Sequence, residues 1–328
     1  MVKLSVLDLA PIPQGSGAGD ALRHSAALAQ AAERLGYTRY WMAEHHSMPG
    51  IASAATAVAL AWIGSQTSSI RIGSGGIMLP NHAPLIVAEQ FGTLASLFPG
   101  RVDLGLGRAP GTDRAAAYAM RRNLSSDENQ FPNDVMEVMR YFRGENGAVR
   151  AIPGEGLDIP VYVLGSSLFG AQLAAALGLP YAFASHFAPQ QMEEAIELYR
   201  RHFRPSDQLE RPYVMLGFNC FAADTDEEAQ RLATSVQQAF VALRTGRPGQ
   251  LPPPVENYAD TLPPQGRAIL ESVLSCSAIG SRETVRRQVE AFAARTEADE
   301  LIVTAQIYDP AARIRSYALL AEAMATPA

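Results

Sequence analysis

The sequence of 328 residues is poor in cysteine and in lysine. Its two cysteines, Cys220 and Cys276, lie far apart and form no CxxC pair. Neither a disulfide framework nor a structural zinc site is therefore predicted, and a reducing cytoplasm is the expected compartment. Lys3 is the only lysine of the chain, so no lysine follows a later strand to form a Schiff base. This absence argues against a lyase or aldolase of the Schiff-base type.

The sequence also lacks basic runs and long apolar runs. The 33 acidic residues outnumber the 27 basic ones, and no more than two basic residues are adjacent, which argues against binding to nucleic acid. The longest nearly uncharged stretch, 51–64, has about 14 residues, whereas a membrane span needs about 20. Asp8 interrupts the short apolar stretch at the N-terminus, unlike the core of a signal peptide. We expect neither membrane insertion nor export.

The order of predicted elements indicates the fold. Strands and helices alternate along the chain, and Leu9 is followed by a Pro/Gln/Gly loop without the G-x-G-x-x-G pattern of a doubly wound dinucleotide fold. Eight strands with intervening helices favour an α/β fold of the (β/α)8 TIM-barrel type. The strands are expected at 3–9, 37–43, 70–79, 102–106, 160–164, 181–184, 213–221 and 301–304, and the helices at 21–35, 51–64, 84–97, 114–122, 128–142, 169–177, 189–203, 226–243, 266–274, 282–293 and 311–324.

Helix-capping residues set several of these boundaries. Asp20 is the expected N-cap of the first helix, and Thr225 with Glu228 three residues later forms a capping box before helix 226–243.

The chain is longer than a plain barrel, which needs about 250 residues. We assign the surplus to one domain over 1–328, with insertions at about 110–160 after strand four and 246–274 after strand seven. Both insertions would lie on the site face, as a wall and a lid.

In such a barrel the active site lies at the carboxyl ends of the strands. Five segments place polar or glycine residues there: Glu44-His45-His46, residues 73–76 leading to Pro80-Asn81-His82, residues 105–111, Gly165-Ser166-Ser167, and Ser185-His186-Phe187. Adjacent histidines on an extended backbone point in different directions, so at most one of His45 and His46 faces the barrel opening. They are not a zinc pair, and an imidazole at this place can serve proton transfer or merely stabilise the loop.

Two further features suggest a ligand. Arg108 among glycines, and Ser166 and Ser167 before a helix, can together bind one anionic group such as a phosphate. Gly75-Gly76 within a strand indicates either a bulge or a flat ring lying on the backbone.

These segments resemble a known family when they are taken together and in order. Residues 42–46, 72–84 and 100–108, with Leu164-Gly165-Ser166-Ser167 and residues 298–304, resemble the bacterial luciferase-like flavin monooxygenases, over nearly the whole chain. The resemblance implies a barrel that binds reduced FMN from a separate NAD(P)H:flavin reductase. It further implies that the bound flavin reacts with dioxygen to a flavin hydroperoxide, which oxygenates a small organic substrate, a long-chain aldehyde in luciferases. It also implies a homodimer.

The same resemblance assigns roles to individual residues. His45 matches the catalytic histidine, and Gly75 and Gly76 match a non-prolyl cis peptide beneath the flavin ring. Glu44, Arg108, Leu164, Gly165, Ser166 and Ser167 are expected cofactor-binding residues, with Arg108 and the serines at the phosphate. The chain has Gly107 where luciferase has a reactive cysteine and Ser166 where it has a carboxylate, so light emission is not implied. A deazaflavin-dependent oxidoreductase of the same superfamily and a flavin-binding protein without turnover remain alternatives.

Overall fold

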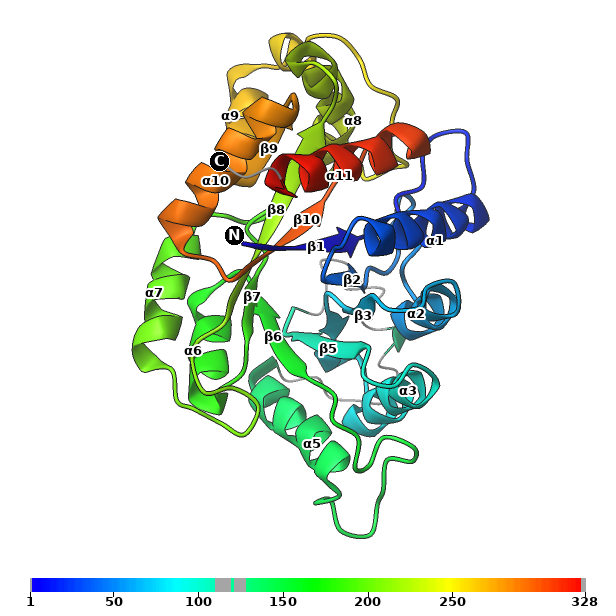
Figure 1. Cartoon of the computed structure of the whole chain (residues 1–328), viewed down its shortest axis with the longest axis vertical. Coiled ribbons are helices and arrows are strands. Elements are labelled where there is room, and N and C mark those ends of the chain that lie inside the picture. Colours follow the sequence, from blue (N-terminus) through cyan, green and yellow to red (C-terminus); the bar gives the residue numbers. More distant parts are fainter. Residues whose placement is uncertain (1, 110–118, 121–127, 326–328) are drawn as a thin grey trace.

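Short parallel strands form a closed barrel at the centre of the protein (Figure 1). The computed structural model describes residues 2–109, 119–120 and 128–325. In the barrel each strand pairs in parallel with the next, and the pairing of β10 with both β8 and β1 closes the ring. The (β/α)8 prediction is therefore confirmed. The eight barrel strands are β1 Lys3–Asp8, β2 Arg39–Met42, β3 Arg71–Ser74, β5 Val102–Gly107, β6 Val161–Gly165, β7 Tyr181–Phe183, β8 Val214–Ala222 and β10 Glu300–Thr304.

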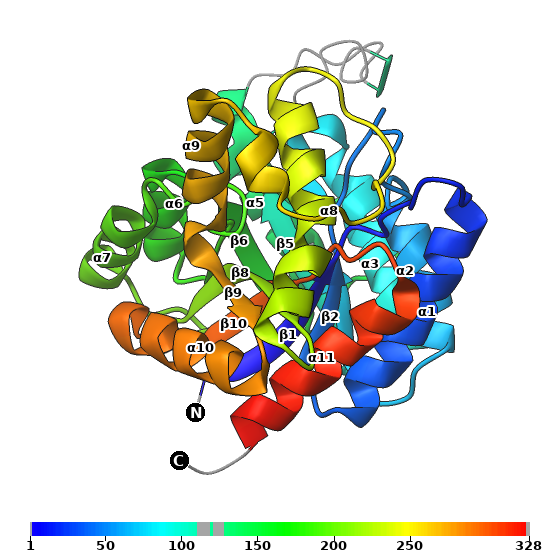
Figure 2. The ribbon, with the colours of Figure 1, turned by 90° about the horizontal axis from the view of Figure 1, so that it is seen from above.

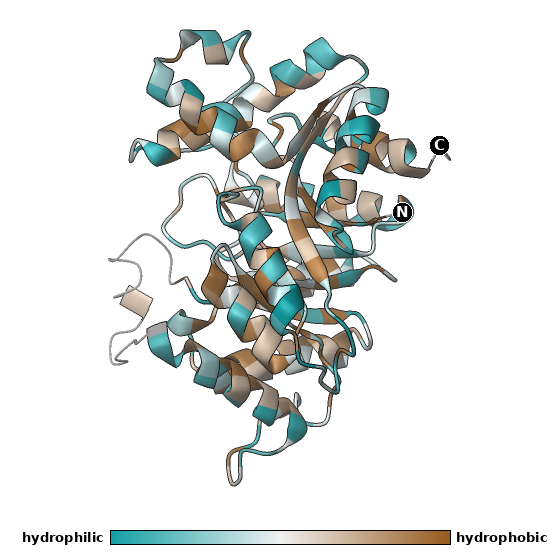
Figure 3. Ribbon diagram, turned by 90° about the vertical axis from the view of Figure 1, so that its left-hand side faces the viewer, coloured by the Kyte–Doolittle hydropathy of each residue, from teal (hydrophilic) through white to brown (hydrophobic). Residues whose placement is uncertain are grey.

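Helices surround the barrel on all sides (Figure 2). Their buried apolar faces and the strands form the main core, and Figure 3 shows the apolar colours on the strands and the polar colours on the outer helix faces. None of the helices in the described ranges is long and apolar enough to cross a membrane. The helices that follow the barrel strands in turn are α1 Ala18–Arg34, α2 Thr56–Ser65, α3 Pro84–Leu97, α5 Phe131–Arg143, α6 Leu168–Leu177, α7 Met192–His202, α10 Arg282–Thr296 and α11 Pro310–Ala325.

A long stretch of chain, called the excursion below, separates β8 from β10. Helix α8 (Asp226–Arg244) follows β8, and α10 lies beside α7: Arg200 of α7 donates to the carbonyl oxygens of Thr296 and Glu297 at 3.0 and 2.6 Å. The excursion includes α8, α9 (Pro264–Val273) and β9 (Ser277–Gly280), a strand that we did not predict. β9 pairs in parallel with the end of β8, outside the closed ring.

Several element boundaries differ from those predicted. Helix α1 begins three residues before the expected first residue, because Gly17 is its N-cap and Asp20 lies inside the first turn, where its carboxylate accepts the Gly17 N–H at 3.3 Å. Thr225 does cap α8 and accepts the Glu228 N–H at 3.2 Å. The predicted strand 70–79 is split into β3 and β4 (Ile77–Met78). Most of the predicted helix 114–122 lies outside the described residues.

The two ends of the barrel interior are chemically different. At the amino ends of the strands, the buried Arg39 guanidinium donates to Asp103 and Glu300, both at 2.8 Å, and to the Tyr162 hydroxyl at 2.7 Å. Trp41 also donates to Asp103, at 3.1 Å. These paired charges and rings close the amino end. The carboxyl ends of the strands, called the mouth below, are where the active sites of such barrels lie.

Part of the excursion after β8 reaches the loops of the mouth. Leu251 exchanges backbone hydrogen bonds with Ile12 and Gln14 in the loop after β1, at 2.9 and 2.8 Å. A Cβ atom on Gly50, which follows β2, would lie only 2.2 Å from the Gly249 carbonyl oxygen. Residues 249–251 therefore pack directly on loops that follow two barrel strands, which is where the sequence predicted a lid.

Candidate functional site

Three glycines, Gly75, Gly76 and Gly105, lie together at the ends of β3 and β5 and are called the glycine surface below. The Gly75-Gly76 peptide bond is cis, and the Ser74 hydroxyl joins the two strands by donating to the Gly105 carbonyl oxygen at 2.9 Å. A Cβ atom on Gly76 would lie 2.8 Å from the Gly105 oxygen, and one on Gly105 would lie 2.2 Å from the Ser74 oxygen. Because these neighbours are backbone atoms, no side chain fits there. Leu164 of β6 packs against both glycines.

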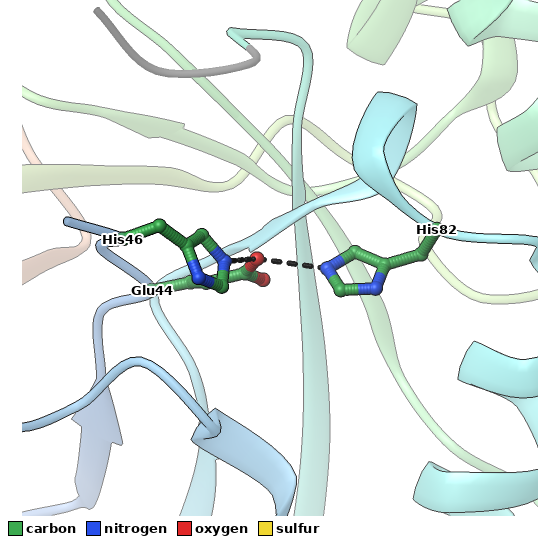
Figure 4. A group of neighbouring side chains, drawn as sticks. All are labelled: Glu44, His46 and His82. Carbon is green, nitrogen blue, oxygen red and sulfur yellow. Dashed lines mark hydrogen bonds and ion pairs between the residues drawn. The ribbon is translucent and has the colours of Figure 1, made fainter. Parts of the chain in front are cut away.

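Glu44 lies at the centre of a hydrogen-bonded cluster beside this surface (Figure 4). Its Oε1 atom accepts from Nε2 of His46 at 2.5 Å and from Nε2 of His82 at 2.8 Å, while Oε2 accepts the Met78 N–H at 3.0 Å. The cluster connects the end of β2 to the chain after β4. Burial by itself would raise the pKa of Glu44. The hydrogen bond and charge of His82, the hydrogen bond from His46 and the hydrogen bond from the Met78 N–H hold this pKa below its usual value.

Glu44, His46 and His82 also have the composition of a metal site. Their ligand atoms lie within 4.8 Å of one another, and no other group of this kind occurs in the described part of the chain. In Figure 4, however, one carboxylate oxygen lies between the two rings, and the N···O distances are those of hydrogen bonds. The arrangement therefore satisfies its own polar atoms, and it fixes both backbone segments.

His45 lies outside the Glu44 cluster, because its side chain, unlike that of His46, makes no hydrogen bond to Glu44. It follows Trp41 and Ala43, which belong to the cluster inside the barrel. Its Nδ1 atom is buried and has no hydrogen-bond partner. Burial lowers the pKa of His45 to about 4, an effect that the charge of Glu44 offsets only in part. The imidazole is therefore neutral near pH 7, with one N–H to donate and one nitrogen to accept.

Arg108 lies beside the N-terminus of α6, as the predicted anion site requires. Its guanidinium carbon is 4.3 Å from the centre of the Phe169 ring in the first turn of α6. Within the described ranges the guanidinium forms no hydrogen bond or ion pair, so its donors are available to a ligand. Ser167 is the N-cap of α6, but its side chain makes no capping hydrogen bond. Ser166 is exposed, and the half-buried Gly165 precedes it.

The structure draws attention to residues to which the sequence assigned no individual role. His82 was noted only as part of a loop, and its contact with Glu44, 38 positions away, had no local signal. His186 and Thr304 also carry buried, unpartnered atoms. Their position directly after or at the end of a barrel strand was the available signal, but it is shared by many residues that have no function.

Comparison with known proteins identifies the family. The profile of the luciferase-like monooxygenase family matches residues 2–300. The chain belongs to this family. It is 52% identical over 320 residues to a luciferase-like monooxygenase of Escherichia coli (strain K12), covering 97% of this chain and 96% of that protein. It is 30% identical over 334 residues to the N-acetyl-S-alkylcysteine monooxygenase of Bacillus subtilis (strain 168), covering 99% and 98% of the two chains.

Solved structures agree with the barrel fold. The crystal structure of apo-MsnO8 matches with a TM-score of 0.89 at 35% identity and full coverage of both chains. Two solved structures below 20% identity share the fold: the oxygenating constituent of 3,6-diketocamphane monooxygenase from Pseudomonas putida in complex with FMN, and an F420-dependent secondary alcohol dehydrogenase. Their TM-scores are 0.73 and 0.72, with coverage of 98% or more of each chain. This luciferase-like monooxygenase is thus an oxidoreductase.

Proposed function

We propose that this luciferase-like monooxygenase is the oxygenase component of a two-component system that uses reduced FMN and dioxygen to oxidise an organic substrate. One observation carries the proposal: Arg108 beside the first turn of α6, the glycine surface and His45 all lie at the carboxyl ends of the barrel strands. The anion site would bind the FMN phosphate, and the glycine surface would support its flat ring. The FMN complex of the diketocamphane monooxygenase supports this cofactor for the fold.

The residues around the anion site suit a phosphate. Arg108 would supply a guanidinium that no described residue bonds, and the first turn of α6 would supply backbone N–H groups with the positive end of the helix dipole. Ser166 and Ser167 would add hydroxyl groups. Gly165 and Leu164 at the end of β6 would complete the contact with the cofactor, and Leu164 already packs against Gly76 and Gly105.

When bound, reduced FMN would supply the reaction with dioxygen and the oxygen atom that is transferred to the substrate. His45 would act as the proton-handling residue, because it is neutral near pH 7 and faces the barrel interior. Glu44 has both carboxylate oxygens occupied by His46, His82 and Met78. We therefore assign to Glu44 the positioning of the segments that carry His45 and the glycine surface. Residues 249–251 would help to exclude water.

An anaerobic titration tests the choice of cofactor. The protein is titrated with reduced FMN and, separately, with reduced F420, and binding is followed by the absorbance of each flavin. We expect saturable binding of reduced FMN and at least tenfold weaker binding of F420 (about 1.4 kcal/mol). The opposite order would overturn the FMN assignment and favour the deazaflavin-dependent reading. A flavin reductase with NADH should supply reduced FMN to the same protein in a coupled assay.

We further propose a homodimer that forms through helices α2 and α3. These neighbouring helices expose large apolar side chains, among them Val58 (73% exposed), Trp62 (45%) and Ile86 (45%). An exposed apolar patch of this kind is typical of a protein interface. Sedimentation equilibrium should give twice the monomer mass of 35.2 kDa. The substitution Trp62→Arg should convert the dimer to monomer, and a monomeric wild-type protein would refute the proposal.

A further inference from the structure

A second histidine faces the mouth from the opposite side of the barrel. His186 follows β7, which is four strands away from β2 in the ring of eight. Met215 of β8 lies in the interior cluster, so Gly217, two residues later in the same strand, also faces inward, and the His186 ring packs against it. His186 is close enough to His45 for the charge of one ring to affect the other.

Two residues of β8 hold this ring in place. A Cβ atom on Gly217 would lie 2.1 Å from Nδ1 of His186, so the ring occupies the space that a side chain at position 217 would need. Asn219 donates its amide N–H to the carbonyl oxygen of His186 at 2.9 Å. A side chain on Gly217 would therefore displace the ring, and the absence of one allows His186 to fold inward.

Unpartnered polar atoms gather at this end of the barrel. Within the described ranges, four buried side-chain atoms have no hydrogen-bond partner: Nδ1 of His45, Nδ1 of His186, Oγ1 of Thr304 and Oγ of Ser235. The first three belong to residues at or just after the carboxyl ends of strands, and Thr304 is opposite Asn219 in the strand register. Buried polar atoms without partners are uncommon, so three of them at one end of the barrel distinguish this region from the rest of the described interior.

The chemistry of the rings limits that molecule. Burial, with a smaller effect of His45, lowers the pKa of His186 to about 4, so both imidazoles are neutral near pH 7. The Nε2 atoms are not among the buried unpartnered atoms and form no hydrogen bond in the described structure, so they are free to donate to a ligand that reaches them. With the proton on Nε2, each ring donates one hydrogen bond into the mouth and leaves only a lone pair unpartnered in the wall.

We propose that His186 is a second ligand-binding histidine, which together with His45 donates Nε2–H to an uncharged acceptor, a carbonyl oxygen or a ring nitrogen. The proposal rests on the proposed function, which places a flavin ring and an organic substrate at this mouth. Either of them can carry the acceptor. A carboxylate is not the expected partner, because neither ring carries a positive charge.

Nitrogen-15 spectra of the histidine side chains in the wild-type protein test this proposal. The six histidines are assigned with single variants, and reduced FMN is added under argon while its binding is followed by absorbance. Decanal is then added as a neutral carbonyl probe, and decanoate is added to a second sample as its charged counterpart. His202, which is exposed at the end of α7, serves as the internal control.

A shift of the His186 Nε2 signal with FMN alone supports the proposal and identifies the flavin ring as the acceptor. A shift that appears only with decanal, and not with decanoate, supports it and identifies the organic substrate. If FMN binds and neither addition moves His186 more than His202, the proposal is overturned and the proposed function stands. If reduced FMN does not bind, the proposed function fails and this proposal fails with it.

A double-mutant cycle tests whether Gly217 acts through His186. The substitution Gly217→Ala in the wild-type background should weaken binding of the responding ligand about tenfold, the effect of one lost hydrogen bond. In a His186→Ala background the same substitution should have less than about a twofold effect, because the ring it displaces is gone. Equal losses in the two backgrounds would show that Gly217 matters for packing alone and would contradict the role of His186.

Discussion

The isosteric substitution Glu44→Gln perturbs the hydrogen-bonded cluster most specifically. A glutamine keeps one oxygen, which can still accept from His46 and His82, but its NH2 group then faces the Met78 N–H. Each of the two hydrogen bonds from His46 and His82 changes from charge-assisted to neutral, which costs about 1 kcal/mol. The Met78 N–H loses its partner, which costs about 1 kcal/mol or more. We therefore expect the free energy of unfolding to fall by about 3 kcal/mol at pH 7.

Urea denaturation monitored by circular dichroism measures this loss. Glu145→Gln, on an exposed glutamate, is the matched control and should change the free energy of unfolding by less than about 0.5 kcal/mol. The folded-state pKa of Glu44 lies below the usual value of 4.5, so its stabilisation is complete above that pH and is lost as the pH falls through the folded-state pKa. The wild type and Glu44→Gln should therefore converge in acid. A loss equal to that of the control at pH 7 would refute this account of the cluster.

Three further predictions concern other parts of the molecule. Arg108→Ala should weaken binding of reduced FMN about tenfold to a hundredfold in an anaerobic titration. The control Arg247→Ala, on the exposed loop after α8, should leave the affinity unchanged. If Arg108→Ala binds reduced FMN as tightly as the wild type, Arg108 is not part of the phosphate site. Gly76→Ala should lower the free energy of unfolding by about 1–3 kcal/mol, because its Cβ would meet the Gly105 oxygen at 2.8 Å, and wild-type stability in urea would contradict this. Burial would raise the pKa of Glu33, but hydrogen bonds from backbone N–H groups lower it to about 2. Above pH 4.5, Glu33→Gln should therefore lower the free energy of unfolding by about 1 kcal/mol after solvent screening. The difference between the variant and the wild type should vanish as the pH falls toward 2. A difference independent of pH would show that the Glu33 charge is not the cause.

The sequence predicted the barrel because its strands and helices carry strong local signals. The helix 84–97 was predicted with the observed ends, since Pro84 suits a first turn and the apolar residues follow the helical period. Asp20 was misassigned because a carboxylate in the first turn and one at the N-cap give similar local patterns. β9 was missed since its four residues, Ser277–Gly280, are stabilised by pairing with β8, which is distant in sequence.

The sequence predicted the residues of the candidate site that follow strand ends, but not the contacts that depend on how the loops fold. Arg108 and Ser167 were expected to meet because parallel strands that are neighbours in the barrel end at the same edge, and the structure brings Arg108 to the first turn of α6. The contact of His82 with Glu44 depends on how the chain after β4 folds back, which no short motif specifies. The same holds for His186, whose inward position depends on the absence of a side chain at Gly217.

Rapid mixing of the anaerobic complex of protein and reduced FMN with oxygenated buffer tests the proposed oxygenase function most directly. The absorbance of the flavin is followed from milliseconds to minutes, beside the same concentration of free reduced FMN. If the site handles reduced FMN as proposed, oxidation in the complex will follow a course distinct from that of the free flavin, and His45→Ala will shift it toward the free course without abolishing binding. Oxidation at the free-flavin rate, with identical spectra throughout, would contradict the proposed function.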